Sequence, residues 1–154
     1  MEGVDAVDGR ADQARTLGFV SATGLDPDAE ITFVATPVLS LASQVQQALD
    51  VTRGVVTDVG SVKTGVSAAI ASPRFVGGHP MAGSELEGLD GADANMFEGA
   101  VWVLTPSAST DDATFSAVAA VVSELGAEVV ALAPERHDQV VAVISHVPHL
   151  TAAT

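Results

Sequence analysis

The sequence has 154 residues, of which 47% are hydrophobic, so it can bury the core of one globular domain and is not intrinsically disordered. Lys and Arg number 6 against 20 Asp and Glu, and the resulting net charge of −14 disfavours binding to nucleic acid or to an anionic membrane. The absence of cysteine excludes disulfides, and no apolar run reaches the about 18 residues of a membrane span. We therefore expect a cytoplasmic protein that binds neither nucleic acid nor membrane.

The first half of the chain alternates short apolar runs with helical periodicities. We predict strands at residues 4–7, 31–35 and 54–58, and helices at residues 11–17, 38–49 and 62–70. The second helix has the clearest apolar stripe, with residues at helical spacing: Val38, Leu41, Ala42, Val45 and Leu49. Thr36 is predicted to be its N-cap, and Pro37 its first helical residue.

The same alternation continues in the second half. We predict strands at residues 75–77, 100–104 and 128–132, a glycine-rich loop at 78–95, and helices at 112–125 and from Pro134 onward. Alternating strands and helices with nearly continuous apolar strands are typical of a doubly wound, mostly parallel α/β sheet. We expect a sheet domain at residues 1–133, followed at residues 134–154 by the start of a long C-terminal helix.

Polar residues follow three of the predicted strands. Asp8 is predicted to end the first strand, where dinucleotide-binding folds place the acid that binds the ribose hydroxyls. Thr36-Pro37 and Gly60-Ser61 follow the next two strands, although Thr36 and Ser61 could instead cap the helices after them. Because ligands of open α/β sheets bind at the carboxyl ends of strands, these residues together predict a cofactor cleft.

The four histidines lie in two parts of the sequence. His79 is surrounded by glycines that leave its imidazole little shielded, and a neutral histidine is suited to accept a proton from a hydroxyl. His137, His146 and His149 lie on the last predicted helix, where they could also be partly exposed residues without a role. A zinc site formed by His79, His146 and His149 is a further alternative, but Pro148 interrupts the helical pair, so we predict no metal site.

Five segments, in this order, resemble the prephenate/arogenate dehydrogenase family of tyrosine biosynthesis: ITFVATPV, TDVGSVK, GGHPMAGSE, MFEGAVWVLTP and ERHDQVVAVISHVPH. The resemblance implies a Rossmann-like domain that binds NAD, with NADP as the alternative. It implies the oxidative decarboxylation of prephenate to 4-hydroxyphenylpyruvate, or of arogenate to tyrosine.

The resemblance also implies roles for individual residues. His79 matches the catalytic histidine that contacts the substrate hydroxyl, and Ser61 matches a serine that contacts both this hydroxyl and the nicotinamide. Asp8 matches the acid that binds the ribose. The residues that match the lining of the substrate pocket are Ser145, His146 and His149.

Two features of the family have no counterpart in this sequence. The G-x-G-x-x-G fingerprint is absent, and so is the helical domain that forms the family's dimer. We therefore expect a fragment of a family member, which forms a homodimer only together with that helical domain. A catalytically silent fragment and a related dehydrogenase acting on another hydroxy acid remain alternatives.

Overall fold

A computed structural model describes residues 1–84, 86 and 88–143. Its main sheet has five strands in chain order: β3 (Ile31–Val34), β4 (Val55–Asp58), β5 (Phe75–Pro80), β6 (Val101–Thr105) and β7 (Glu128–Ala131). A separate two-stranded sheet contains β1 (Glu2–Gly3) and β2 (Ala22–Thr23). The helices within these residues are α1 (Arg10–Thr16), α2 (Val38–Val51), α3 (Thr64–Ala69), α4 (Asp112–Glu124) and α5 (Pro134–Val141), with a short 3-10 turn, η1 (Gly88–Gly91).

The predicted mostly parallel sheet is confirmed, with one antiparallel pair. Strands β3, β4 and β5 run parallel to one another, and β6 runs parallel to β7, but β5 and β6 are antiparallel. A parallel connection needs a crossover, usually a helix, and the connection between β5 and β6 contains only the short turn η1 among its described residues. The chain therefore turns back along β5 instead of crossing over the sheet.

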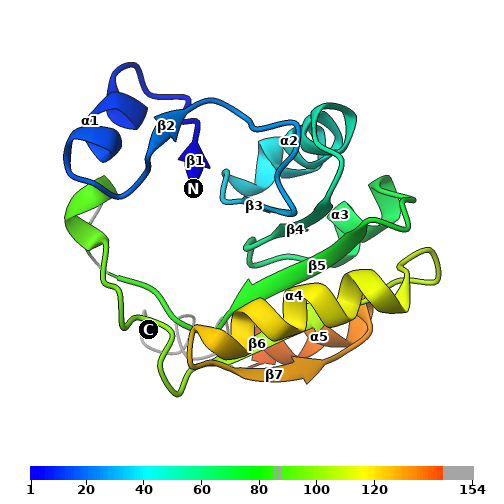
Figure 1. The fold of residues 1–154 in the computed structure, drawn as a ribbon. Helices are drawn as coiled ribbons and strands as arrows, with labels where there is room; N and C mark the ends of the chain where they lie inside the picture. The colour runs from blue at the N-terminus through cyan, green and yellow to red at the C-terminus, as the bar shows by residue number, and fades with distance from the viewer. Residues whose placement is uncertain (85, 87, 144–154) are drawn as a thin grey trace.

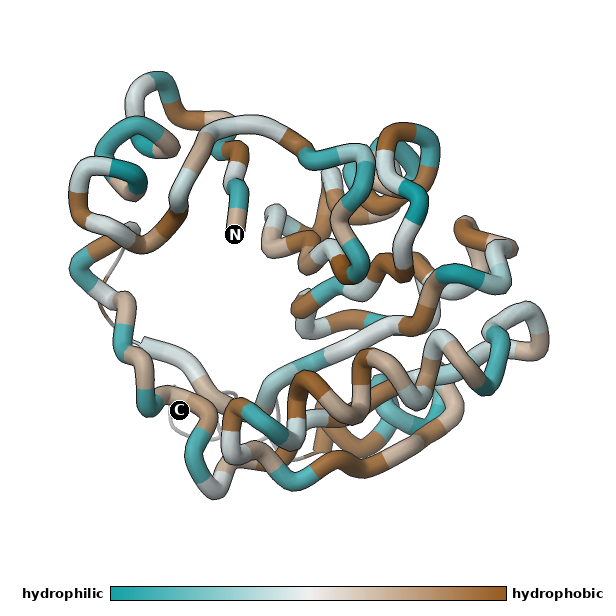
Figure 2. The backbone as a smooth tube through the Cα atoms, in the orientation of Figure 1, coloured by the Kyte–Doolittle hydropathy of each residue, from teal (hydrophilic) through white to brown (hydrophobic). Residues whose placement is uncertain are grey.

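Helices cover both faces of the main sheet, as a doubly wound fold requires (Figure 1). On one face, α2 and α3 pack Leu41, Val45 and Val66 against Val56 of β4 and other strand residues. On the other face, α4 packs Val118 and Val122 against residues that include Val76 of β5 and Trp102 of β6. Hydrophobic residues accordingly gather where α2 and α4 meet the strands (Figure 2).

The predicted strand at residues 4–7 is wrong. The first strand is Glu2–Gly3, and it pairs only with β2. Val4 and Val7 are 65% and 49% exposed, so they do not supply the buried face that their apolar character suggested. Residues 5–9 instead form a turn, in which Val7 donates a backbone hydrogen bond to Asp5 Oδ1 at 2.7 Å.

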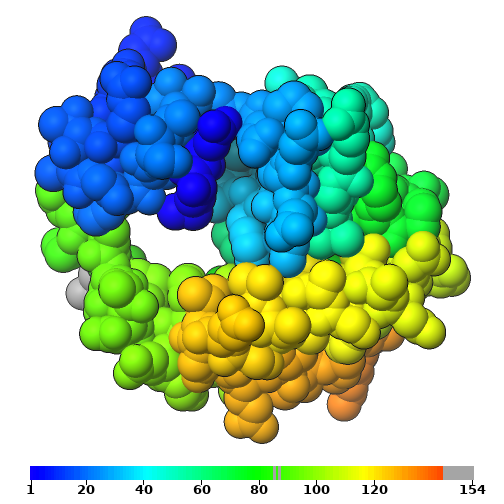
Figure 3. Space-filling model, viewed as in Figure 1, coloured from blue at the N-terminus to red at the C-terminus, as the bar shows by residue number. Residues whose placement is uncertain are grey.

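A cavity of about 750 Å³ separates the small sheet from the main sheet. Residues of β1 and β3 line its two sides, and Val121 of α4 also contributes to its wall. Figure 3 shows this opening between the N-terminal residues and the rest of the molecule. Of the predicted site residues that the structure describes, none lines this cavity, which therefore lies apart from His79 and Ser61.

The predicted helix from Pro134 is confirmed as far as Val141, with Pro134 in its first turn. It packs against α3 and β6. Ser145, His146 and His149 lie outside the described residues, and the predicted division at residue 133 stays a prediction. Within the described part of the chain, no helix is long and apolar enough to cross a membrane.

Candidate active site

His79 lies on strand β5, whereas the sequence predicted a loop from residue 78 onward. The strand continues to Pro80 because Gly78, His79 and Pro80 pair with Leu104, Val103 and Trp102 of β6. This pairing fixes the backbone of His79 within the sheet.

Gly77 and Gly78 permit the close packing around this part of β5. A Cβ atom on Gly77 would lie 2.4 Å from Thr105 Oγ1, and one on Gly78 would lie 2.6 Å from the carbonyl oxygen of Asp58. A side chain on Gly78 would therefore collide with backbone. The two glycines that the sequence suggested for access to His79 thus serve the packing of three strands.

A fully buried ion pair between Asp58 and Lys63 contacts Gly78, the residue before His79. Lys63 Nζ also donates to the carbonyl of Gly78 at 2.7 Å. Asp58 accepts backbone hydrogen bonds from Gly60 at 2.9 Å and from Gly78 at 3.2 Å. One carboxylate therefore holds both the residue before Ser61 and the residue before His79.

Burial opposes the charge on both members of this pair. It raises the pKa of Asp58 and lowers the pKa of Lys63, while the attraction between the two charges acts in the opposite direction on each. Three backbone groups form further hydrogen bonds to the pair and so compensate part of its loss of hydration: the Gly60 and Gly78 amides and the Gly78 carbonyl.

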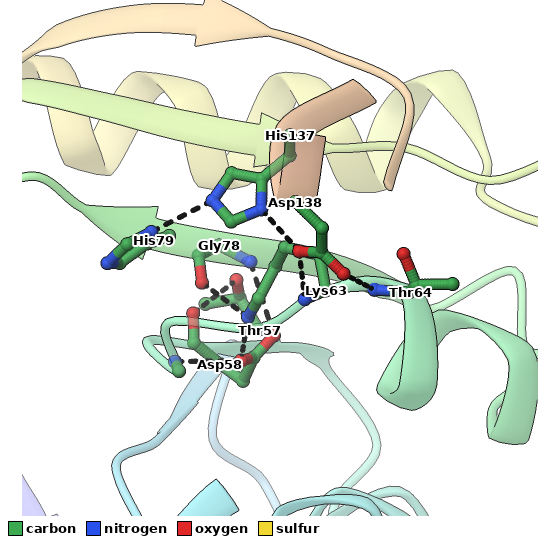
Figure 4. A network of polar contacts seen from close by, with 9 residues as sticks. Thr57, Asp58, Lys63, Thr64, Gly78, His79, His137 and Asp138 are labelled. Atoms are coloured by element: carbon green, nitrogen blue, oxygen red, sulfur yellow. Dashed lines mark hydrogen bonds and ion pairs between the residues drawn. The ribbon is translucent and has the colours of Figure 1, made fainter. Parts of the chain in front are cut away.

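His79 is the first member of a chain of three polar side chains (Figure 4). Its Nδ1 lies 2.8 Å from Nε2 of His137, and Nδ1 of His137 lies 2.8 Å from Oδ1 of Asp138. His137 is fully buried. Asp138 also accepts backbone hydrogen bonds from Lys63 at 2.8 Å and Thr64 at 2.9 Å, so a side chain of α5 caps the N-terminus of α3.

The charge states in this chain follow from its surroundings. Burial, followed by the nearby His137 and Lys63, lowers the pKa of His79 to about 4, so its imidazole is neutral at physiological pH. Partial burial acts to raise the pKa of Asp138, but hydrogen bonds from Thr64, Lys63 and His137 outweigh it and lower this pKa to about 2. The site therefore pairs a neutral imidazole with an ionised carboxylate.

Neither predicted helix cap occurs. Helix α2 begins at Val38 with Pro37 at the N-cap position, and Thr36 makes no capping hydrogen bond. The Thr36 hydroxyl is buried and has no hydrogen-bond partner among the described residues. Ser61 is exposed and does not cap α3 either, because Asp138 takes that role.

Two of the three predicted cofactor segments come together at one edge of the sheet. β3 and β4 are parallel neighbours with Val34 opposite Asp58, so Thr36-Pro37 and Gly60-Ser61 follow strands that end side by side. Asp8 does not end a strand as predicted. It is exposed, in the turn before α1, and belongs to the part of the chain built around the separate small sheet.

The residues that hold His79 in place had no role predicted from the sequence: Asp58, Lys63, His137 and Asp138. Asp58 and Lys63 were visible in the TDVGSVK segment, and the adjacent His137 and Asp138 in the ERHDQ segment. Their contacts join residues as far as 75 positions apart, and no local pattern reveals them. Within the described residues, no group of three His, Asp or Glu is suited to hold a metal ion.

Comparison with known proteins agrees with this architecture. The family model "Prephenate dehydrogenase, nucleotide-binding domain" matches residues 1–131. Prephenate dehydrogenase of Bacillus subtilis is 34% identical over 166 aligned residues, which cover 99% of this chain and 44% of that protein.

Solved structures agree in fold. A crystal structure of prephenate dehydrogenase from Aquifex aeolicus has a TM-score of 0.90 and 30% identity, covering 98% of this chain and 58% of that one. Synechocystis arogenate dehydrogenase has a TM-score of 0.86 and 34% identity, covering 96% and 56%. The Rossmann-like fold is thus confirmed, and the chain spans about half the length of these relatives. The chain belongs to the prephenate dehydrogenase family and corresponds to its nucleotide-binding domain.

Proposed function

We propose that this chain is the part of an NAD-dependent enzyme that carries the catalytic histidine for the oxidative decarboxylation of prephenate or arogenate. The observation that carries the proposal is the neutral His79, fixed on β5 and tied through Asp58 to the turn that bears Ser61. An imidazole in this state is suited to accept a hydrogen bond from a substrate hydroxyl. The relatives named prephenate and arogenate dehydrogenase support this choice of substrate class.

The residues at the ends of β3 and β4 are suited to contact the nicotinamide part of NAD. We propose that the cofactor is contacted by Thr36, Pro37, Gly60 and Ser61. The Thr36 hydroxyl is buried and has no hydrogen-bond partner among the described residues. Ser61 is exposed, and it follows the strand that neighbours the one before Thr36. The structure of the Aquifex aeolicus relative was determined with NAD+, which favours NAD here. The chemistry that NAD supplies when bound is the acceptance of a hydride.

We assign the ribose hydroxyls to the turn after β1, which contains Asp5 and Asp8. Asp8 is the residue that the family resemblance indicated, whereas Asp5 lies nearer the end of the strand. Asp5 also forms a 3.6 Å ion pair with Arg10, which makes Arg10 less available to bind the 2′-phosphate of NADP. This pairing is a second reason to propose NAD as the cofactor.

His79 acts on the substrate hydroxyl in the proposed reaction. The substrate loses a hydride from the carbon that bears this hydroxyl, and the ring carboxylate leaves as carbon dioxide. The electron pair of the broken carbon–carbon bond completes the aromatic ring, so the protein needs neither a strong acid nor a metal. His79 accepts the hydroxyl hydrogen bond while positive charge develops there, and Ser61 orients the same group.

We also propose roles for the C-terminal residues and a division of the chain into domains. Ser145, His146 and His149 line the substrate pocket, and the homodimer forms through a helical domain like that of the longer family members. Residues 1–133 form the cofactor-binding domain, and residues from 134 onward lead to that helical domain.

A chimera tests the function directly. The segment of the Bacillus subtilis relative that aligns with this chain is replaced by residues 1–154, and the product is assayed for reduced nicotinamide by its absorbance. Prephenate and arogenate are each tested with NAD and with NADP. We expect turnover with NAD and at least one of the two substrates. A chimera that folds and binds NAD but turns over neither substrate would contradict the proposal.

A further inference from the structure

We infer that Asp138 and His137 act as positioning residues that fix the tautomer of His79, with the proton on Nδ1 and the lone pair on Nε2. The position of the proton on the His79 ring can be measured in this chain whether or not the chain turns over substrate. Its meaning for catalysis rests on the function proposed above.

Asp138 sets the direction of the hydrogen bond that it forms with His137. An ionised carboxylate only accepts hydrogen bonds, and Asp138 is held ionised by the backbone N–H groups of Lys63 and Thr64. Nδ1 of His137, which lies 2.8 Å from Oδ1 of Asp138, must therefore carry a proton and donate it. The two backbone contacts also fix the carboxylate so that Oδ1 stays in reach of His137.

His137 in turn sets the direction of the hydrogen bond between its Nε2 and Nδ1 of His79. In the neutral form of His137, which has a single N–H, donation through Nδ1 leaves Nε2 unprotonated. This Nε2 lies 2.8 Å from Nδ1 of His79 and accepts a hydrogen bond from it. The proton of neutral His79 is thus held on Nδ1, and its Nε2 keeps a free lone pair. In Figure 4 this second nitrogen of His79 points away from the network.

The tautomer decides what His79 can do with a hydroxyl. With the lone pair on Nε2, the outward side of the ring accepts a hydrogen bond. The opposite tautomer would present an N–H there and could not accept a hydroxyl proton. An aspartate that orients a catalytic imidazole through Nδ1 acts in the same way in serine proteases, although here a second histidine lies between the two groups.

Nitrogen NMR of the histidine rings tests the inference. The ¹⁵N-labelled chain contains 4 histidines, and a His79→Asn sample identifies the signals of His79. At mildly alkaline pH, we expect the shifts of His79 to show a protonated Nδ1 and an unprotonated Nε2. A protonated Nε2, or a mixture of the two tautomers, would overturn the inference.

A His137→Phe variant removes the acceptor from His79 but leaves Asp138 bound to the amides of Lys63 and Thr64. We expect the single tautomer of His79 to be lost, with Nε2–H becoming populated. Glu135→Gln is the matched control, because it replaces an exposed side chain on the same helix and should leave the tautomer unchanged. A folded His137→Phe protein with the parental tautomer would refute the proposed role of His137 in fixing the tautomer of His79.

Should His137→Phe fail to fold, the parental spectrum decides the matter alone. The tautomer experiment is separate from the test of function. If His79 has the expected tautomer but the chimera is inactive, the proposed role of Asp138 and His137 is supported and the proposed function is rejected. In an active chimera, His137→Phe should lower kcat with little change in KM, because the tautomer of His79 affects its hydrogen bond with the reacting hydroxyl.

Discussion

His79 meets the physical conditions for accepting a hydrogen bond at neutral pH. It is uncharged because its pKa lies near 4, it is fixed on a strand by pairing with Val103, and one ring nitrogen is held by His137. A histidine on a loop would satisfy these conditions less well, because the orientation of its ring would have to be fixed by loop residues. The position of the residue is therefore as important as its identity.

Removing the imidazole should mainly affect the chemical step. In the active chimera, His79→Asn is expected to lower kcat by about 10²–10⁴ with little change in KM, the range for a lost general base. His149→Asn, at a proposed pocket position, should act mainly on KM. Steady-state kinetics measure both values, and a kcat of His79→Asn within a few-fold of the parent would show that His79 is not the catalytic group.

The low pKa of His79 also affects stability. The unfolded chain protonates this histidine near pH 6.5 and the folded protein only near pH 4, so between these values the unfolded state binds more protons. The contribution of His79 to the free energy of unfolding is complete above pH 6.5 and falls as the pH drops toward 4. Urea denaturation across this window should show a smaller pH dependence for His79→Asn than for the parent. Equal slopes would contradict the assignment.

At the scale of the elements, strand β5 is fixed between its two neighbours by glycines and by a buried ion pair. Gly77 and Gly78 allow Asp58, Lys63 and Thr105 to approach the strand closely. Asp58 and Lys63 then bind the backbone of Gly78 on both its N–H and its carbonyl side. The backbone next to His79 is therefore held by a side chain at the end of β4 and by one at the start of α3, as well as by strand pairing.

Two glycine substitutions should have opposite effects on stability. Gly78→Ala places a Cβ atom 2.6 Å from a backbone oxygen and should destabilise the protein by about 1–3 kcal/mol, the cost of overpacking. Gly65→Ala lies in α3 with nothing within 4 Å, and should stabilise it by about 0.5–1 kcal/mol. Urea denaturation of both variants provides the comparison. Unchanged stability of Gly78→Ala would mean that β5 adjusts its position.

At the scale of the whole molecule, the N-terminal part and the main sheet are separated by a cavity of about 750 Å³. The cofactor residues proposed here are divided in the same way. Thr36 and Gly60-Ser61 follow strands of the main sheet, whereas Asp5 and Asp8 follow β1 of the small sheet. A dinucleotide bound by both groups would have to contact both sheets.

This organisation predicts weak binding of NAD by the chain alone. The given sequence contains no G-x-G-x-x-G motif, the turn that places the pyrophosphate at a helix N-terminus in dinucleotide-binding folds. We expect isothermal titration calorimetry to give a Kd well above the micromolar range. Micromolar affinity would contradict the prediction, and in that case Asp5→Asn and Asp8→Asn would show which carboxylate binds the ribose.

Most elements of the main sheet could be located from the amino-acid sequence, in the right order and at about the right positions. Apolar periodicity is a local property, so it located the strands β3, β4 and β7 and the buried residues Leu41, Val45 and Leu49 of α2, whose packing partners it does not specify. Val38, predicted in the same stripe, is 48% exposed. The segments around Thr36, Ser61, His79 and His137 also identified the family. The same local reasoning failed at residues 4–7, where apolar residues lie in an exposed turn, and at Thr36, which caps no helix.

The assembly of the site depends on contacts between elements that are distant in the sequence. The sequence placed His79 in a loop, but pairing with β6 extends β5 through it. It also separated His79 from His137 by 58 positions, and their contact depends on how α5 packs over the sheet. Likewise, the cap of α3 comes from Asp138 instead of the nearby Ser61. Local pattern cannot reveal such contacts, because they depend on the relative placement of elements that packing and strand pairing establish only in the folded chain.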